Sequence, residues 1–328
     1  AGDVNGDGFD DVIVGAPFDD PNGDLSGASF VVFGSAEGVG VELTELEGAA
    51  GADPTGFVIN GVAADDQSGI SVSGAGDVNG DGLDDLIVGV KAANPNGLLS
   101  GASYVVFGKA DGAAVELSAV ELNAGAVPTG FIIKGISEDD SSGRSVSDAG
   151  DVNGDGLDDL IIGATGTDTN GSGSGSSFVV YGKTGGAAVE LSLVASSVGG
   201  FVINGVNADD QSGSSVSGAG DVNGDGFADL IVGAPFDDPN GNSYSGASFV
   251  VFGGNFTESV THVGTSAAET ITGTTGDDII YAGGGTDTIT ATAGNDRLLG
   301  GQGADTCLLY TSDAADDLLC VDLGGRRI

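Results

Sequence analysis

Four copies of an Asp-Val-Asn-Gly-Asp-Gly-x-x-Asp segment, beginning at Asp3, Asp77, Asp151 and Asp221, are the strongest candidates for chemistry in this chain. Positions 1, 3, 5 and 9 of each copy carry oxygen-bearing side chains, and position 6 is always glycine. Ca²⁺ prefers about six to eight oxygen ligands, and glycine permits the sharp turn that aims the carbonyl of position 7 inward. The spacing therefore predicts four calcium loops. The predicted ligands are Asp3, Asn5, Asp7, Phe9 and Asp11; Asp77, Asn79, Asp81, Leu83 and Asp85; Asp151, Asn153, Asp155, Leu157 and Asp159; and Asp221, Asn223, Asp225, Phe227 and Asp229, with position 7 acting through its carbonyl.

Position 8 of the segment serves as an internal control. It is aspartate in three copies but Ala228 in the fourth, whereas position 9 is aspartate in all four. A residue that one copy replaces by alanine is not needed to complete the oxygen shell. We therefore exclude position 8 from the predicted ligands.

The segment has two other possible interpretations. An Asp/Asn/Gly-rich turn is common in acidic β proteins, but four spaced copies with three carboxylates each favour a metal site. An EF-hand requires a bidentate glutamate at position 12 and a following helix. Here position 12 is Val14, Val88, Ile162 or Val232, within β-branched runs that end at glycine. The loop is therefore predicted to connect two strands.

The composition indicates an all-β protein. The chain has 328 residues, 63 of them glycine, no tryptophan, and short Val/Ile/Phe runs separated by turn residues. A formal net charge of −41 argues against a nucleic-acid partner and is offset in part by bound Ca²⁺. No apolar run reaches the length of a membrane span, so we expect no membrane insertion. The chain has neither an initiating methionine nor a signal peptide, and we expect it to be an internal fragment.

A unit of about 70 residues repeats around the loops, whose first aspartates are spaced by 74, 74 and 70 residues. Each unit is predicted to contain a strand such as 56–62, a turn, a second strand such as 71–76, the loop, a third strand such as 86–89, and a fourth such as 102–108. Four strands per unit of this length are typical of a β-propeller blade.

The unit resembles the FG-GAP repeat, the blade of the integrin α-subunit propeller. The resemblance lies in Phe33-Gly34, Phe107-Gly108 and Phe252-Gly253, in Gly15-Ala16-Pro17 and Gly233-Ala234-Pro235, and in the four loops. Two copies lack the proline, at Lys91 and Thr165, and Tyr181-Gly182 replaces Phe-Gly. The resemblance covers residues 1–254. Because the family's rings usually hold more blades, it implies an incomplete β-propeller of about 3.5 blades with exposed strand edges.

A nine-residue period follows at residues 264–306, after a predicted linker at 255–263. The sixth positions are Glu269, Asp278, Asp287, Asp296 and Asp305, and the eighth positions are Ile271, Ile280, Ile289 and Leu298. This pattern resembles the RTX or haemolysin-type repeat, which implies a short parallel β-roll with Ca²⁺ held at its glycine-rich turns and the eighth residues inside. The alternative is a Gly/Thr-rich linker. The four aspartates are the predicted metal ligands of this part.

Residues 307–328 resemble a translated sequencing adapter. The nonapeptide period stops there, and both cysteines lie in this segment, so cysteine usage says nothing about disulfides. We predict that this segment is an artefact.

No catalytic constellation is present in the sequence. The only histidine, His262, lies in the predicted linker with no nucleophile motif beside it, so we predict that the chain is not an enzyme. The pairs Asp65-Asp66, Asp139-Asp140 and Asp209-Asp210 recur before the second strand. We favour turn capping for them over additional metal ligation.

The leading functional hypothesis is a calcium-binding, secreted or cell-surface bacterial protein. Its integrin α-like propeller would serve adhesion to an extracellular protein or glycan ligand, with folding coupled to extracellular Ca²⁺. The alternative is an accessory region of a large secreted RTX-type enzyme, such as a phospholipase, protease or lyase. A purely structural surface stalk is a third possibility. The sequence of the loops does not identify the ligand.

Overall fold

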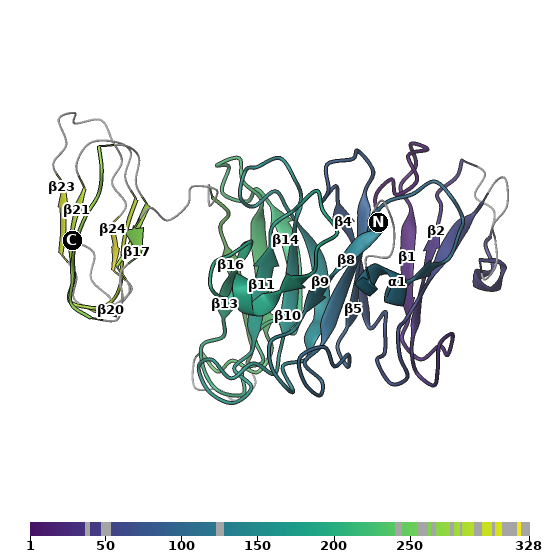
Figure 1. Cartoon of the computed structure of the whole chain (residues 1–328), viewed down its shortest axis with the longest axis horizontal. Helices are drawn as coiled ribbons and strands as arrows, with labels where there is room; N and C mark the ends of the chain where they lie inside the picture. The colour runs from purple at the N-terminus through teal and green to yellow at the C-terminus, as the bar shows by residue number, and fades with distance from the viewer. Residues whose placement is uncertain are drawn as a thin grey trace. The chain divides into compact units, whose positions relative to one another are not determined.

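The computed structural model describes residues 1–36, 40–46, 54–122, 128–239 and 245–254, and in its C-terminal part 262–263, 267–275, 279–282, 284–291, 297–303, 306–309 and 320–322. The chain divides into two compact units, Ala1–Asn255 and Phe256–Ile328 (Figure 1).

The first unit consists of four antiparallel sheets that follow one another along the chain (Figure 1). The first sheet holds β1 (Val12–Ala16), β2 (Ala28–Val32) and β3 (Gly56–Asn60), and the second holds β4 (Ser71–Gly76), β5 (Asp85–Val90), β6 (Ala102–Val106) and β8 (Gly130–Lys134). The third holds β9 (Ser142–Gly150), β10 (Asp159–Ala164), β11 (Ser176–Val180) and β13 (Gly200–Asn204), and the fourth β14 (Ser215–Gly220), β15 (Asp229–Ala234) and β16 (Ala247–Val251). The short strands β7 (Val115–Glu116) and β12 (Val189–Glu190) pair in parallel with β3 and β8.

This arrangement confirms the predicted all-β, incomplete propeller. Four blade-like sheets follow one another, and none is closed within the described residues. It also shows that the sequence unit and the sheet are offset by one strand. The strand at 56–60, which begins a sequence unit, is β3 and pairs with β2 of the preceding sheet. Likewise β8 pairs with β6, and β13 pairs with β11. Each of the first three sheets is therefore completed by a strand of the unit that follows it, which ties neighbouring units together.

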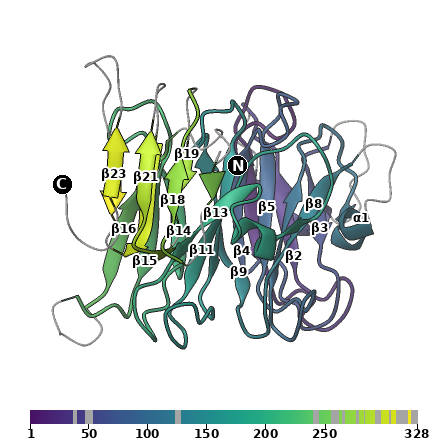
Figure 2. The same ribbon diagram turned by 60° about the vertical axis from the view of Figure 1, so that its left-hand side comes forward.

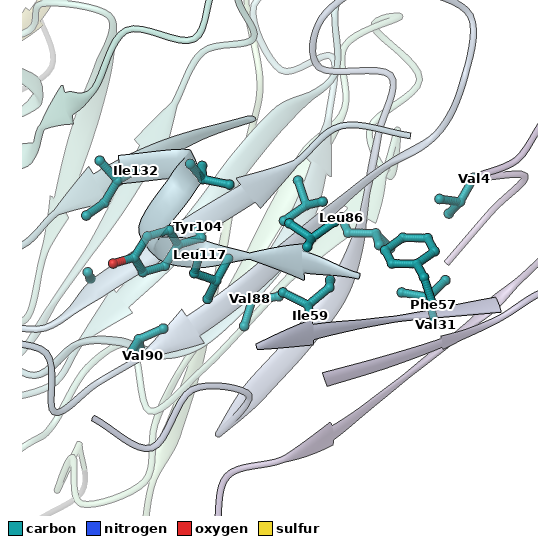
Figure 3. Packing of buried hydrophobic residues seen from close by; sticks show 14 of the residues in the cluster. Val4, Val31, Phe57, Ile59, Leu86, Val88, Val90, Tyr104, Leu117 and Ile132 are labelled. Atoms are coloured by element: carbon teal, nitrogen blue, oxygen red, sulfur yellow. The ribbon is translucent and has the colours of Figure 1, made fainter. Parts of the chain in front are cut away.

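The core lies between the sheets rather than within any one of them. Successive residues of a strand point to opposite faces, so Leu86 and Val88 of β5 pack toward the first sheet while Ile87 packs toward the third. In the first of these interfaces, Phe57 and Ile59 of β3 belong to the same buried cluster as Leu86 (Figure 3). An inner strand with both faces covered reads as a continuous apolar run, which explains sequences such as Leu-Ile-Val after each loop.

On their outer faces the two end sheets pack against no further sheet of this unit within the described residues, although Leu46 covers Phe30 and Val58 of the first sheet. On β1, Val12 is 55% and Val14 40% exposed, and on β16 Val250 is 49% exposed. All six residues of β5 are buried, although its sequence differs little from that of β15. Burial is therefore set by the presence of a neighbouring sheet.

Three short helical segments interrupt the β pattern, and the sequence did not predict them. They are η1 (Leu43–Glu45), α1 (Leu117–Leu122) and α2 (Leu191–Val194). Leu117 and Val120 of α1 are buried in the first inter-sheet core, and Leu191 and Val194 of α2 in the second. Among the described residues, none of the helices combines the length and hydropathy that a membrane span requires.

The second unit is built from parallel strands. Most pairs are offset by 18 residues, which is two nonapeptides, but Leu298 pairs with Cys320, 22 residues further along the chain. The strands are β17 (His262–Val263), β18 (Thr270–Thr272), β19 (Ile279–Tyr281), β20 (Gly284–Gly285), β21 (Thr288–Ala291), β22 (Arg297–Gly303), β23 (Thr306–Leu309) and β24 (Cys320–Asp322). Strands β18, β21 and β23 lie side by side (Figure 2), with Ile271 opposite Ile289 and Ile289 opposite Cys307. Ile280, Ile289 and Leu298 are fully buried, as expected for the eighth positions of the repeat.

The assignment of residues 307–328 to an adapter stays a prediction. Within that segment the structure describes Cys307–Leu309 as the end of β23, and Cys320–Asp322 as β24. Strand pairing does not bear on the origin of a sequence.

Candidate calcium loops

The predicted calcium loops connect antiparallel strands. The second, third and fourth loops join β4 to β5, β9 to β10 and β14 to β15. The first loop lies between an isolated bridge that pairs Gly2 with Asp11 and the start of β1. The predicted strand–loop–strand arrangement is therefore confirmed, and all four loops lie at the same end of their strands.

The aspartate at position 1 organises each loop. In the second loop, Oδ1 of Asp77 accepts hydrogen bonds from the amides of Gly80 at 2.7 Å and Asp81 at 3.0 Å, and Oδ2 accepts one from Gly82 at 2.9 Å. Asp3, Asp151 and Asp221 accept the same three bonds in their loops. Gly82 has φ +90°, which favours glycine at position 6. One carboxylate thus accepts hydrogen bonds from three backbone amides and fixes the curvature of the loop.

Positions 3 and 5 continue the turn. Oδ1 of Asp81 accepts a hydrogen bond from the amide of Leu83 at 3.0 Å, and position 5 makes the same bond to position 7 in the other loops. Asn5 accepts a bond from the amide of Asp7 at 2.8 Å, as do Asn153 and Asn223 from their equivalents. These bonds are those of an Asx-rich turn, and they pre-form the loop.

The aspartate at position 9 is buried and links the loop to the next strand. Oδ2 of Asp85 accepts a hydrogen bond from the amide of Val78 at 3.1 Å, and Oδ1 accepts one from Gly108 at 2.9 Å. The corresponding glycines 34, 182 and 253 donate to Asp11, Asp159 and Asp229. A Cβ on Gly108 would lie 2.7 Å from the carbonyl oxygen of Asp84. The Phe-Gly motif therefore has a physical role that the sequence did not reveal: its glycine lets the amide reach the buried carboxylate.

Electrostatic crowding accompanies this burial. Desolvation, followed by repulsion from the carboxylates at positions 5 and 1, raises the pKa of Asp85 and of Asp159 to about 7, against the two backbone hydrogen bonds that lower it. Burial also raises the pKa of Asp11. A divalent cation in the loop would favour the ionised form and oppose this repulsion.

The donor set suits Ca²⁺. The carbonyl oxygens of Phe9, Leu83, Leu157 and Phe227 at position 7 accept no hydrogen bond within the described residues. Oδ1 of the position-1 aspartate accepts two hydrogen bonds, but its Oδ2 accepts one and keeps a lone pair, as does Oδ1 of the position-5 aspartate. Carboxylate, amide and carbonyl oxygens are the ligands that Ca²⁺ prefers. In the part of the chain that the structure describes, however, no three His, Cys, Asp or Glu side chains already lie together in a metal-holding group. The residues thus fit the ion chemically, and their role as ligands stays a prediction.

Position 8 links successive loops instead of completing one. Oδ2 of Asp84 accepts a hydrogen bond from the amide of Asp3 at 2.6 Å, and Oδ2 of Asp158 accepts one from Asp77 at 2.9 Å. Ala228 keeps only the backbone bond, from its amide to the carbonyl of Asp151. The partners are 81 residues apart. No local sequence signal could have identified this contact between sheets.

The recurring acidic pairs cap turns, as predicted. Oδ2 of Asp66 accepts a hydrogen bond from the amide of Ala63 at 3.1 Å, and Asp140 and Asp210 make the same contact with Ser137 and Asn207. Their preceding residues, Asp65, Asp139 and Asp209, have φ of +66°, +66° and +65°.

One predicted ligand of the β-roll lies within the described residues. Asp287 is buried, at 1% exposure, and its Oδ1 accepts a hydrogen bond from the amide of Glu269 at 2.8 Å. The sixth positions also connect consecutive coils through the backbone. The carbonyl of Asp287 accepts a hydrogen bond from the amide of Thr306, and the carbonyl of Glu269 accepts one from the amide of Thr288. Asp278, Asp296 and Asp305 lie outside the described residues.

Comparison with known families matches both repeats. A model described as FG-GAP repeat matches residues 1–32, 68–106, 143–180 and 212–251. A model described as RTX calcium-binding nonapeptide repeat matches residues 263–298 and 283–308. Each of the four FG-GAP matches contains strands of one sheet, and all but the first also contain the strand that precedes the loop. Both resemblances seen in the sequence are confirmed.

Two curated proteins are similar to part of the chain. Integrin alpha pat-2 of Caenorhabditis elegans is 33% identical over 162 residues, which is 49% of this chain and 12% of that protein. Integrin alpha pat-2 of Caenorhabditis briggsae is 32% identical over the same length and the same shares. The matched region thus spans about an eighth of the length of these relatives.

Proposed function

Because this chain carries four FG-GAP repeats followed by RTX calcium-binding nonapeptide repeats, we propose that it is a non-catalytic binding module whose folding is coupled to Ca²⁺. The RTX repeats indicate Ca²⁺ binding. The observation that carries the proposal for the FG-GAP part is the repeated loop itself. Each loop combines a carbonyl that accepts no hydrogen bond from the described part of the chain with a buried position-9 carboxylate in an acidic surrounding.

The proposed ligands are those predicted from the sequence, at positions 1, 3, 5, 7 and 9 of each loop and at the aspartates of the β-roll. Asp77 and its equivalents shape the loop by holding three amides, and Asp85 and its equivalents fix it to the following strands. Bound Ca²⁺ supplies the positive charge that offsets the mutual repulsion of these groups. Because the ligands converge only when the loop is folded, ion binding and folding of the loop are linked.

We further propose two functional domains and an extracellular setting. Residues 1–254 form the FG-GAP propeller part and 264–306 the β-roll, joined through 255–263. The similarity to integrin α chains supports a secreted or cell-surface location and a role in adhesion to an extracellular protein or glycan. Weak sites that fill at millimolar extracellular Ca²⁺ would leave a chain of net charge −41 self-repelling in a low-calcium compartment. The RTX resemblance supports a bacterial origin.

Calorimetric titration of the whole chain with Ca²⁺, followed by circular dichroism, tests this proposal. Several weak sites and a gain of β signal are expected on binding, with a higher melting temperature. An equal titration with Mg²⁺ is the control, since Mg²⁺ demands a smaller and more regular oxygen shell. If neither heat nor a spectral change accompanied Ca²⁺ addition, the coupling of folding to the ion would be refuted.

A further inference from the structure

A pocket of about 440 Å³ opens at the strand ends opposite the calcium loops. Gln67, Ser141 and Gln211 line it from the turns directly before β4, β9 and β14, whereas the loops follow the far ends of those strands. Corresponding positions of three successive sheets therefore converge on one site. The two ends of the propeller part thus have different chemistry.

The pocket contains the cations of this unit that are not otherwise engaged. Among the described residues of the first unit, Lys109 pairs with Asp111, Lys134 pairs with Glu190, and Lys183 lies 4.2 Å from the ring centre of Phe131. The two other basic residues, Lys91 and Arg144, both line the pocket and form no ion pair within the described residues. None of the lining residues is acidic. In a chain of charge −41, a described lining with two cations and no acid distinguishes this pocket.

The backbone around the pocket is held in an unusual conformation. Gln67, Leu99, Ser141 and Gln211 all line it, and their φ values are +58°, +53°, +54° and +50°. Non-glycine residues in the left-handed region cost free energy and cluster at ligand sites. The same conformation recurs in the turns before β4, β9 and β14, so these turns present Gln67, Ser141 and Gln211 to the pocket in the same backbone geometry.

The two cations stand where the repeat departs from its own pattern. Lys91 occupies the position of Pro17 and Pro235, and Arg144 the position of Ile70 and Ser214. The loss of proline that separates the second and third copies from the others thus coincides with the basic pocket, which Thr165 also lines.

Lys91 and Arg144 come from neighbouring sheets whose backbones touch. A Cβ on Gly143 would lie 3.1 Å from the amide nitrogen of Val90, and one on Gly89 would lie 2.2 Å from the carbonyl oxygen of Gly143. Lys91 directly follows Val90, and Arg144 directly follows Gly143. The close approach of the two backbones therefore keeps both cations at the same pocket.

We propose that this pocket binds the carboxylate of an acidic peptide segment, with Lys91 and Arg144 as the charged donors. Gln67, Gln211, Ser141 and Thr165 provide neutral polar groups around the anion, and Arg144 offers the planar fork that suits a carboxylate. Ala92 and Leu99 provide an apolar wall for the aliphatic part of an Asp or Glu side chain. A peptide is favoured over a sugar acid because the described lining has no aromatic ring face. This inference rests on the proposed binding role and gives its ligand a chemical class.

The test uses the full chain with saturating Ca²⁺ and a fluorescein-labelled peptide of alternating glycine, aspartate and glutamate, followed by anisotropy. The neutral probe replaces aspartate and glutamate with asparagine and glutamine. The protein variant is Lys91→Thr with Arg144→Ser, both taken from the chain's own repeats so that the fold is retained. The matched control is Lys134→Thr, which removes one cation outside the pocket. Thermal melts and Ca²⁺ titration of each sample report on folding.

We expect the acidic peptide to bind the unchanged chain about tenfold more tightly than its amide counterpart, and the double variant to lose about tenfold in affinity. Lys134→Thr should leave the affinity within about twofold. Equal binding of the two peptides, unchanged affinity of a folded double variant, or a preference for an oligouronate would overturn the proposal. Absence of peptide binding with Ca²⁺ binding intact would refute the pocket alone, whereas absence of Ca²⁺ binding would refute the proposed function.

Discussion

The inner and end sheets of the first unit have almost the same sequences and very different surroundings. Strand β10 reads Asp-Leu-Ile-Ile-Gly-Ala and is buried throughout, whereas β15 reads Asp-Leu-Ile-Val-Gly-Ala and is partly exposed. Ile161 of β10 has no exposed surface, and the equivalent Ile231 of β15 is 37% exposed. Val152 and Val222, at position 2 of the third and fourth loops, differ in the same way, at 0% and 57%. Contact with a neighbouring sheet, and not the sequence of the strand itself, therefore determines how much each side chain contributes to the free energy of unfolding.

The largest expected effect comes from one substitution made in both surroundings. Ile161→Ala should lower the free energy of unfolding by about 2–5 kcal/mol, because it removes buried methyl groups and leaves a cavity between two sheets. Ile231→Ala should cost about 1 kcal/mol or less, since that side chain keeps contact with water in the folded state. Urea unfolding at fixed Ca²⁺ measures both. Equal losses would show that the fourth sheet is covered in solution and would contradict the comparison.

A smaller effect is expected from the hydrogen bonds that link successive loops. Asp158→Ala removes the acceptor of the Asp77 amide and should cost about 1 kcal/mol. Asp10→Ala is the matched control, because Asp10 occupies the same position in the first loop and accepts no hydrogen bond within the described residues. Thermal melts of the two variants, recorded side by side, compare an inner with an end position. If Asp10→Ala lowered the stability as much as Asp158→Ala, the hydrogen bond between sheets would not be the cause of the loss.

The smallest effect concerns an acid confined to the third sheet. Burial, followed by repulsion from Asp158 and Asp84, raises the pKa of Asp148, against the hydrogen bond from Gly150. The carboxyl group therefore binds its proton more readily folded than unfolded, so ionisation at neutral pH destabilises the native state. This penalty disappears as the pH falls through the raised pKa toward the ordinary value. The second and fourth sheets have glycine at the equivalent positions, Gly74 of β4 and Gly218 of β14.

Asp148→Asn should accordingly raise the melting temperature at pH 7, and the gain should shrink toward pH 4. Glu138→Gln, an exposed acid on the same part of the chain, makes the same charge change without the burial. Melting curves from pH 4 to 8 compare the two. A gain that is constant over this range, or equal for both variants, would contradict the role of burial.

The sequence predicted the features that depend on local spacing. The positions of the loops, the strands after each loop and the capping aspartates follow from residue types a few positions apart, and the buried eighth positions of the β-roll follow from its nine-residue period. It missed what depends on partners far along the chain. The offset between unit and sheet places Gly56–Asn60 beside β2, and Asp84 contacts an amide 81 residues away. Helix α1 places Leu117 and Val120 in the core between the first two sheets. No local sequence pattern predicts that contact.

The Ca²⁺ stoichiometry of a position-5 variant tests the central claim most directly. Asp7→Asn, Asp81→Asn, Asp155→Asn and Asp225→Asn together remove one charged ligand from each FG-GAP loop but keep the oxygen that accepts the position-7 amide. The position-8 variant Asp10→Asn, Asp84→Asn and Asp158→Asn is the control, since those residues lie outside the predicted ligand set. Calorimetry should show the loss or strong weakening of four sites in the first variant and none in the second. An unchanged number of ions bound by the first variant would contradict calcium binding by these loops.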